Sequence, residues 1–64
     1  MPVINIALHK VDDRVKADLI RELTDTAVKI TGIDPERFTI LIDELDDTNI
    51  GCGGKTLKAL KAAR

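Results

Sequence analysis

A stretch with helical periodicity lies between two apolar stretches, and this order limits the fold of the chain more than any other feature. Within residues 13–31, apolar side chains recur every three or four positions, as on a helix with one buried face. They are Val15, Leu19, Leu23, Ala27 and Ile30, and Ile20 widens the stripe. Asp12 precedes the stretch as an N-cap, and Gly32 follows it where a left-handed residue ends a helix. The pattern predicts one long helix from Asp13 to Thr31.

The stretches on either side of this helix are typical of β-strands. Residues 1–8 carry branched apolar side chains and no charge, and residues 38–45 begin with a similar apolar run. A strand, a long helix and a second strand form a βαβ unit, in which the strands are parallel and the crossover is right-handed. The predicted fold class is therefore α/β. One sheet face and both sheet edges remain uncovered, so we expect other copies of the chain to cover them.

The chain is too short to be stabilised by burial alone. Its 64 residues form one predicted domain, residues 1–64, and a domain of this length buries only about 60% of its unfolded surface. Small domains usually add disulfides, a metal or oligomerisation. Cys52 is the only cysteine and His9 the only histidine, which excludes an internal disulfide and a His/Cys zinc site within one chain. We therefore expect an obligate oligomer.

Charge and hydropathy argue against several classes of partner. The 10 basic and 11 acidic residues give a net charge of -1 and alternate along the chain, so no basic face for nucleic acid is expected. No window is apolar enough to span a membrane, and the N-terminus lacks the features of a signal peptide. Together with the unpaired cysteine, these features predict a cytoplasmic protein.

The remaining segments are predicted to be turns, a hairpin and a helical tail. The hairpin, residues 50–54, is rich in glycine, which indicates a backbone that approaches another subunit or a ligand closely. Leu57 and Leu60 anchor the tail, residues 56–64. Turns are predicted at two places: residues 34–37, with Asp34 as a cap and Pro35 in the first position, and residues 46–49.

Several polar features have both a chemical and a structural interpretation. Gly53-Gly54-Lys55-Thr56 matches the end of a phosphate-binding loop, G-x-x-x-x-G-K-[ST], but Asn49 stands where the first glycine belongs. Cys52 has only one lysine nearby to activate it as a nucleophile. The acids within residues 43–47 lack the spacing of a calcium loop, and His9 follows a strand. For each of these features, a hairpin or surface role is the favoured interpretation.

Pro2 is the remaining candidate for chemistry. Because a small second residue favours removal of the initiator methionine, loss of Met1 would expose the prolyl nitrogen. A secondary amine can take up and return a proton. Burial among apolar residues such as Val3, Ile40 and Ile50 disfavours its charged form, which suits a base. Pro2 is therefore the predicted acid–base residue.

Four segments together resemble the 4-oxalocrotonate tautomerase family. They are Met-Pro-Val-Ile-Asn-Ile at the N-terminus, Leu19–Thr24, Ile40–Glu44 and Ile50–Lys55, and the resemblance spans nearly the whole chain. It implies a βαβ monomer with a C-terminal glycine-rich hairpin, assembled as a hexamer that is a trimer of dimers. It also implies that the N-terminal proline, here Pro2, acts as general base and then general acid. The implied reaction is keto–enol tautomerisation of 2-hydroxydienoate-type acids, without a cofactor or metal.

The sequence departs from the family at the positions that bind the substrate. The family's Gly-Arg-Ser/Thr segment corresponds to residues 9–12, where Lys10 replaces the arginine as a point charge. A second family arginine falls at Thr39, and Arg37 lies two residues earlier, on the same side of a strand. The family's aromatic residue before the hairpin falls at Ile50, which keeps an apolar wall. The predicted substrate-binding residues are therefore Lys10, Arg37, Thr39 and Ile50.

The sequence thus predicts a tautomerase that isomerises a small unsaturated 2-hydroxy or 2-oxo acid, with Pro2 beside the glycine-rich hairpin. A second interpretation is a non-catalytic or half-catalytic subunit whose partner chain supplies the missing arginines. A retained Met1 fits that interpretation, because the prolyl nitrogen is then an amide. A third interpretation, based only on the Gly-Gly-Lys-Thr run, is an anion-binding module.

Overall fold

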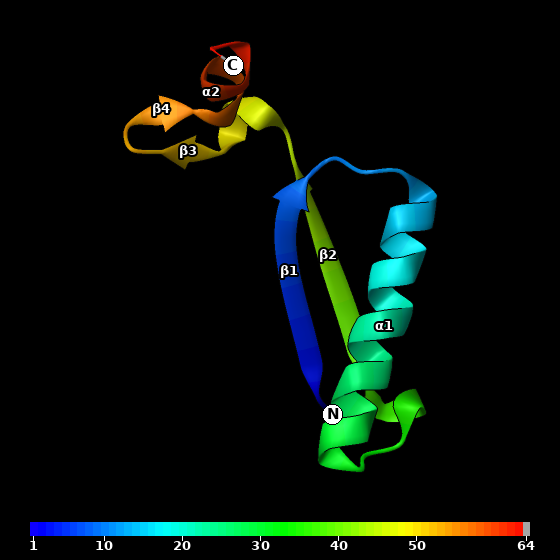
Figure 1. The fold of residues 1–64 in the computed structure, drawn as a ribbon. Coiled ribbons are helices and arrows are strands. Elements are labelled where there is room, and N and C mark those ends of the chain that lie inside the picture. The colour runs from blue at the N-terminus through cyan, green and yellow to red at the C-terminus, as the bar shows by residue number, and fades with distance from the viewer. Residues whose placement is uncertain (64) are drawn as a thin grey trace.

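In a computed structural model that describes residues 1–63, the chain folds in the predicted order of strand, helix and strand (Figure 1). The elements are β1 (Val3–His9), α1 (Asp13–Thr31), the 3-10 helix η1 (Pro35–Arg37), β2 (Thr39–Leu45), the 3-10 helix η2 (Asp47–Asn49), β3 (Gly51–Cys52), β4 (Lys55–Thr56) and α2 (Leu57–Ala62). The predicted bounds of α1 are confirmed, and the second strand begins one residue later than predicted.

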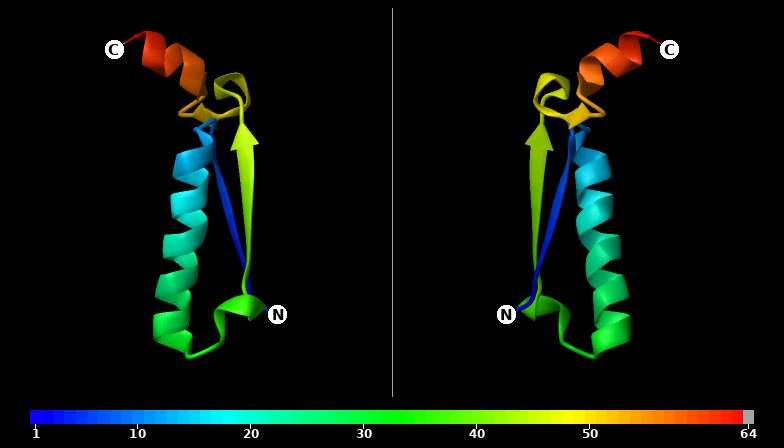
Figure 2. Two further views of the ribbon diagram at one scale, coloured as in Figure 1. Left: turned by 90° about the vertical axis from the view of Figure 1, so that its right-hand side faces the viewer. Right: turned by 90° about the vertical axis from the view of Figure 1, so that its left-hand side faces the viewer.

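β1 and β2 pair in parallel, as the crossover through α1 predicts. Val3 lies opposite Thr39 at one end of the pair, and His9 lies opposite Leu45 at the other. The two side views in Figure 2 show α1 along one face of this sheet. Alternate side chains of the strands are half-buried in consequence, namely Ile4, Ile6, Leu8, Ile40, Ile42 and Glu44. The opposite face of the sheet is open.

Local interactions explain where α1 begins and ends. The Asp12 side chain accepts a hydrogen bond from the backbone N–H of Val15 at 2.9 Å, which caps the first turn and contributes about 1 kcal/mol in a typical helix. At the other end, Gly32 adopts a φ of 75°, and its N–H donates to the Val28 carbonyl oxygen at 2.8 Å. A glycine meets this left-handed geometry at the lowest cost. Both predicted caps are confirmed.

The covered face of α1 differs from the predicted stripe, because Lys16, Thr24 and Val28 are half-buried as well. Leu19, Leu23 and Ala27 are half-buried, but Val15 and Ile30 are 41% and 79% exposed. Val15 lies on the side of the first turn away from the sheet, since its neighbour Lys16 contacts Glu44 of β2. Length explains Ile30: 19 helical residues span about 28 Å and a strand of seven residues about 23 Å, so the C-terminal turn of α1 extends beyond the strand pair (Figure 2).

The chain after β2 forms an arm beyond the end of the strand pair (Figure 1). Its strands β3 and β4 are antiparallel, with Cys52 opposite Lys55, so the predicted hairpin is confirmed. The two residues between them, Gly53 and Gly54, have φ values of 63° and 83°, as a mirror-image two-residue turn requires. A Cβ on either glycine would meet no atom within 4 Å. Within one chain, turn geometry explains these glycines, and close approach to another group does not.

The short helical elements α2 and η1 agree only in part with the sequence pattern. α2 begins at a cap in which the Thr56 hydroxyl accepts from the Ala59 N–H at 3.1 Å, and Leu57 and Leu60 are its half-buried residues, as predicted. Asp34 was predicted as a cap, but its side chain makes no capping hydrogen bond. The carbonyl oxygen of Asp34 instead accepts from the backbone N–H three residues later, so a backbone turn replaces the side-chain cap.

The single chain is elongated and has no fully buried side chain among residues 1–63. Its radius of gyration is 15.0 Å, whereas a compact chain of this length has about 11 Å. On the open sheet face, Leu41 and Val3 are 51% and 45% exposed. Of the helices in the described part of the chain, none is both long and apolar enough to cross a membrane. The incomplete core supports the predicted need for other copies.

Candidate active site

Pro2 lies directly before β1, where the sheet holds its carbonyl group. The backbone N–H of Thr39 donates to the Pro2 carbonyl oxygen at 3.0 Å and extends the ladder by one bond. Pro2 is half-buried, and Met1 is 89% exposed. With Met1 attached, the prolyl nitrogen is an amide and cannot serve as a base. Loss of Met1 would leave a secondary amine held at the end of a paired strand.

Arg37 is the cation that the fold brings to this end of the sheet. It ends η1, and with Met1 it lines a shallow hollow of about 300 Å³. Its side chain is exposed and forms no ion pair with any other residue from 1 to 63. Because Arg37 precedes β2, strand alternation does not place it on the side of Thr39, and that part of the sequence interpretation is wrong. An unpaired guanidinium at the end of the sheet that holds Pro2 is suited to bind a carboxylate.

The other two predicted substrate-binding residues lie at the opposite end of the strand pair. Lys10 directly follows β1, and Ile50 precedes β3 in the arm. A strand of seven residues spans about 23 Å, so neither residue of the same chain reaches Pro2. Ile50 is half-buried, and its carbonyl oxygen accepts from the Leu57 N–H at 2.7 Å. The expectation that Pro2 lies beside the glycine-rich hairpin therefore fails within one chain.

A small hollow of about 160 Å³ lies at this second end, and charged side chains line most of it. Its lining is His9, Lys10, Leu45, Asp46, Asp47 and Lys61. Asp47 is paired with Lys61 at 3.1 Å. Asp46 accepts from the Thr48 hydroxyl and from its backbone N–H, and these two bonds lower the pKa of the Asp46 carboxyl. Lys10 is left without an ion-pair partner among residues 1–63.

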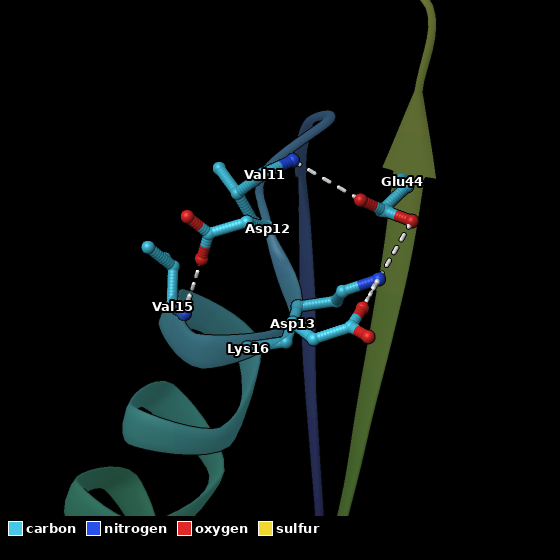
Figure 3. Close-up of polar contacts among 6 residues, drawn as sticks. All are labelled: Val11, Asp12, Asp13, Val15, Lys16 and Glu44. Atoms are coloured by element: carbon cyan, nitrogen blue, oxygen red, sulfur yellow. Dashed lines mark hydrogen bonds and ion pairs between the residues drawn. The ribbon is translucent and has the colours of Figure 1, made fainter.

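Glu44 makes polar contacts that were not predicted from the sequence (Figure 3). One carboxylate oxygen, Oε1, accepts from Lys16 Nζ at 3.1 Å, and the other, Oε2, accepts from the Val11 N–H at 3.1 Å. The pKa of Glu44 is lowered first by the hydrogen bond from Val11 and then by the one from Lys16. The contact with Glu44 in turn raises the pKa of Lys16. The Lys16 side chain is only 28% exposed. The available signal was strand alternation, which puts Glu44 on the face of Ile42, toward α1.

The other polar features fit their structural interpretation. Gly53 and Gly54 form the turn of an antiparallel hairpin, whereas a phosphate-binding loop connects a parallel strand to a long helix. The Thr56 hydroxyl is occupied by the cap of α2. Cys52 is an exposed free thiol, and His9 is an exposed strand end. No cluster of three His, Cys, Asp or Glu side chains that could hold a metal occurs in the described residues.

Comparison with known proteins identifies the family. A sequence profile described as "Tautomerase enzyme" matches residues 2–60. The chain belongs to the tautomerase family. A probable tautomerase of Campylobacter jejuni is 31% identical over 64 residues, which cover 97% of this chain and 94% of the relative. The predicted enzyme class, a tautomerase-type isomerase, is thereby confirmed, whereas the substrate and the role of Pro2 stay predictions.

Solved structures of the tautomerase family share the fold. The crystal structure of DmpI from Helicobacter pylori has a TM-score of 0.88 and 31% identity, and the match covers 95% of this chain and 97% of that chain. A 4-oxalocrotonate tautomerase isozyme from Methylibium petroleiphilum has a TM-score of 0.88 and 27% identity, with 92% and 97% covered. These matches confirm the resemblance to the 4-oxalocrotonate tautomerase family and the predicted α/β class with its parallel strand pair.

Proposed function

We propose that this tautomerase isomerises a small unsaturated 2-hydroxy or 2-oxo acid, with the nitrogen of Pro2, freed by removal of Met1, as the general acid–base. The observation that carries the proposal is that Pro2 and Arg37 lie at the same end of the sheet. Thr39 holds Pro2 in the strand ladder, and Arg37, without an ion-pair partner from 1 to 63, lines an open hollow with Met1 at the same end of the sheet. A base and a carboxylate-binding cation are the two groups that this reaction requires.

The proposed reaction needs one proton carrier and no external reactant. The Pro2 amine takes the proton from the 2-hydroxyl group of the dienol, which leaves a dienolate anion. The resulting ammonium then returns a proton to a carbon of the dienolate, which gives the 2-oxo acid and restores the amine. Arg37 would bind the substrate carboxylate and hold the reacting atoms beside the amine. No cofactor or metal takes part in this scheme.

The complete site, in this proposal, forms between chains. One chain supplies Pro2 and Arg37, and the opposite end of a second chain supplies Lys10 and Ile50. An antiparallel, two-fold arrangement of two copies brings these ends together twice, because a two-fold interface is self-complementary. Lys10 would add a second cation for the substrate, and Ile50 an apolar wall. The open sheet face and the elongated shape of the single chain support such an assembly.

We further propose that three such dimers form a homohexamer, as in the 4-oxalocrotonate tautomerase family. The open face of the sheet carries Val3, Ala7 and Leu41, and a shallow hollow of about 480 Å³ lies over its middle. Burial of these side chains between dimers would complete a core that one chain lacks. The exposed free thiol of Cys52 supports a reducing compartment, the cytoplasm.

The variant Pro2→Ala tests the proposal directly. Alanine still permits removal of Met1 but leaves a flexible primary amine in place of the fixed ring nitrogen. We expect about 100-fold or greater loss of kcat with 2-hydroxymuconate or phenylenolpyruvate, because general acid–base groups typically contribute that much. Intact mass must show that Met1 is absent from both proteins, and light scattering must show equal assembly. Unchanged turnover by the variant would exclude the proline mechanism.

A half-catalytic subunit is the second candidate function. It is favoured by Lys10 and Thr39, which stand where the family has arginines, and by the amide that Pro2 forms while Met1 is attached. It predicts that the pure protein shows no turnover and that a partner chain with the arginines restores it. Turnover by the pure homo-oligomer, after loss of Met1, would exclude this candidate.

A further inference from the structure

Glu44 connects three elements that are distant in the sequence. Its carboxylate extends from β2 toward α1, accepts from Lys16 of that helix, and accepts from the backbone of Val11 in the connection between β1 and α1 (Figure 3). The side chains of Glu44 and Lys16 are 29% and 28% exposed. Both carboxylate oxygens are thus occupied, each by a donor at 3.1 Å. The contact holds the connection against the sheet.

The bond to Val11 also fixes the neighbouring residue, Lys10. The carbonyl of Lys10 and the N–H of Val11 belong to one planar peptide unit, so a bond to that N–H orients the whole unit. On its other side, Lys10 follows His9, which is held in the ladder opposite Leu45. The backbone of Lys10 is therefore fixed from both sides. Its side chain is exposed and makes no ion pair with residues 1–63.

Lys16 keeps the Glu44 carboxylate in this place. It lies one turn after the cap residue Asp12, and it also contacts Asp13 at 3.5 Å. A carboxylate in the otherwise apolar row of Ile40 and Ile42 needs such partners, because an unpaired half-buried charge is costly. The pKa of Glu44 is lowered first by the Val11 bond, then by Lys16, with a smaller effect of Lys10. The carboxylate is therefore ionised near neutral pH.

We propose that Glu44, held by Lys16, is a positioning residue that sets where Lys10 presents its ammonium group to the substrate carboxylate. This inference rests on the proposed function. A lysine has a long flexible stem and a single point charge, so it depends more on a fixed backbone than a bidentate arginine does. In this chain, the connection between β1 and α1 carries Lys10 in place of the family arginine. Glu44 would compensate for this difference by fixing the backbone of Lys10. Glu44 itself does not touch the substrate.

The test is a double-mutant comparison in the assembled protein without Met1. Glu44→Ala is expected to raise KM about tenfold with phenylenolpyruvate and to change kcat by less than about twofold, because only substrate orientation is lost. Lys10→Ala should raise KM by a similar factor. Glu44→Ala combined with Lys10→Ala should raise KM no further than Lys10→Ala alone. If Glu44→Ala raises KM by the same factor in the wild-type and in the Lys10→Ala background, the proposal is overturned.

Two further variants separate positioning from loss of stability. Glu44→Gln keeps an oxygen that can accept from the Val11 N–H. Its KM should therefore stay close to the wild-type value, well below the KM of Glu44→Ala. Glu22→Ala removes an exposed carboxylate from α1 and should leave KM unchanged. If Glu44→Gln raises KM as much as Glu44→Ala does, the hydrogen bond to Val11 does not position Lys10, and the proposal fails.

Hydrogen exchange of the Val11 amide supplies a readout without substrate. Glu44→Ala should speed this exchange about tenfold or more, while Lys10→Ala leaves it unchanged. If the wild-type protein shows no turnover, the proposed function fails, and the Val11 exchange still decides whether Glu44 holds the connection. Slow exchange in Glu44→Ala would overturn the inference even where turnover is observed.

Discussion

The backbone N–H of Thr39 donates to the carbonyl oxygen of Pro2 at 3.0 Å. This bond belongs to the parallel ladder, so β2 determines the position of the residue that precedes β1. Lys10 lies at the other end of the strand pair, directly after the last paired residues, His9 and Leu45. A site that uses both Pro2 and Lys10 therefore requires two chains.

Mixing Pro2→Ala and Lys10→Ala chains, each of which carries an impaired site, tests this requirement. In a dimer of Pro2→Ala and Lys10→Ala chains, one site receives both substitutions and the other receives neither. After the two variants are unfolded and refolded together, about a quarter of all sites should be intact, by the statistics of two-fold pairing. At substrate concentrations well below KM, the activity of the mixture should rise above that of either variant alone. An activity equal to the mean of the two variants would show that the two residues serve the same chain's site or no site.

The open sheet face provides a test of assembly. Leu41→Asp places a charge on a side chain that is 51% exposed in the single chain and that we expect another copy to cover. Burial of an unpaired carboxylate is costly, so light scattering should show a shift from the assembly to smaller species. Ile20→Asp is the matched control, because Ile20 is 43% exposed on α1. An unchanged mass for Leu41→Asp would place the interface elsewhere.

The glycines of the hairpin differ in how well they should tolerate substitution by alanine. Gly53→Ala and Gly54→Ala each force a non-glycine residue into positive φ, at about 1 kcal/mol or more in the free energy of unfolding. Gly51→Ala is the control, because Gly51 lacks positive φ and its added Cβ would lie 3.7 Å from the Lys55 carbonyl oxygen, an ordinary contact. Urea unfolding of the assembled variants gives the comparison. Equal stability of all three variants would contradict the turn assignment.

Glu44 and Lys16 predict a pH dependence with a definite sign. The folded-state pKa of Glu44 lies below its ordinary value of 4.5, so its stabilisation is present above about pH 4.5 and is lost as pH falls through the lower value. The pKa of Lys16 is raised above 10.5, so its stabilisation is present below that pH and is lost as pH rises through the higher value. Both contributions are complete between these limits.

Thermal unfolding of wild type and Glu44→Gln across pH checks this sign. The difference in Tm between the two proteins should be constant near neutral pH and should shrink below about pH 4.5, because protonated glutamate resembles glutamine. Glu22→Gln should show no such change. A difference in Tm that grows on acidification would mean that the surroundings of Glu44 destabilise its ionised carboxylate.

Elements that depend on nearby residues were predictable from the sequence. The bounds of α1 follow from Asp12 and Gly32, which satisfy backbone groups at its two ends. The hairpin follows from the Gly53-Gly54 pair, since few other residues adopt its φ values. The two strands follow from their apolar runs. Each of these signals acts over a few residues, so it can be interpreted without knowledge of the rest of the chain.

The arrangement of the candidate site was not predictable in the same way. Pro2 and Thr39 meet because β1 and β2 pair in one register, which also puts Arg37, two residues before Thr39, at that end of the sheet. The same register separates Lys10 and Ile50 from them. The covered face of α1 differs from the predicted stripe, because periodicity reveals neither which side of the helix meets the sheet nor that its C-terminal turn passes the end of the strands.

By itself, therefore, the sequence determined which segments are helix, strand and turn, and its resemblance to a family indicated Pro2 as the base. Only the tertiary structure decided which charged groups lie together. Glu44 and Lys16 are 28 positions apart, and Glu44 and Val11 are 33 apart. Such pairs depend on strand register and on how α1 lies across the sheet, and neither property is encoded in any local pattern of residues.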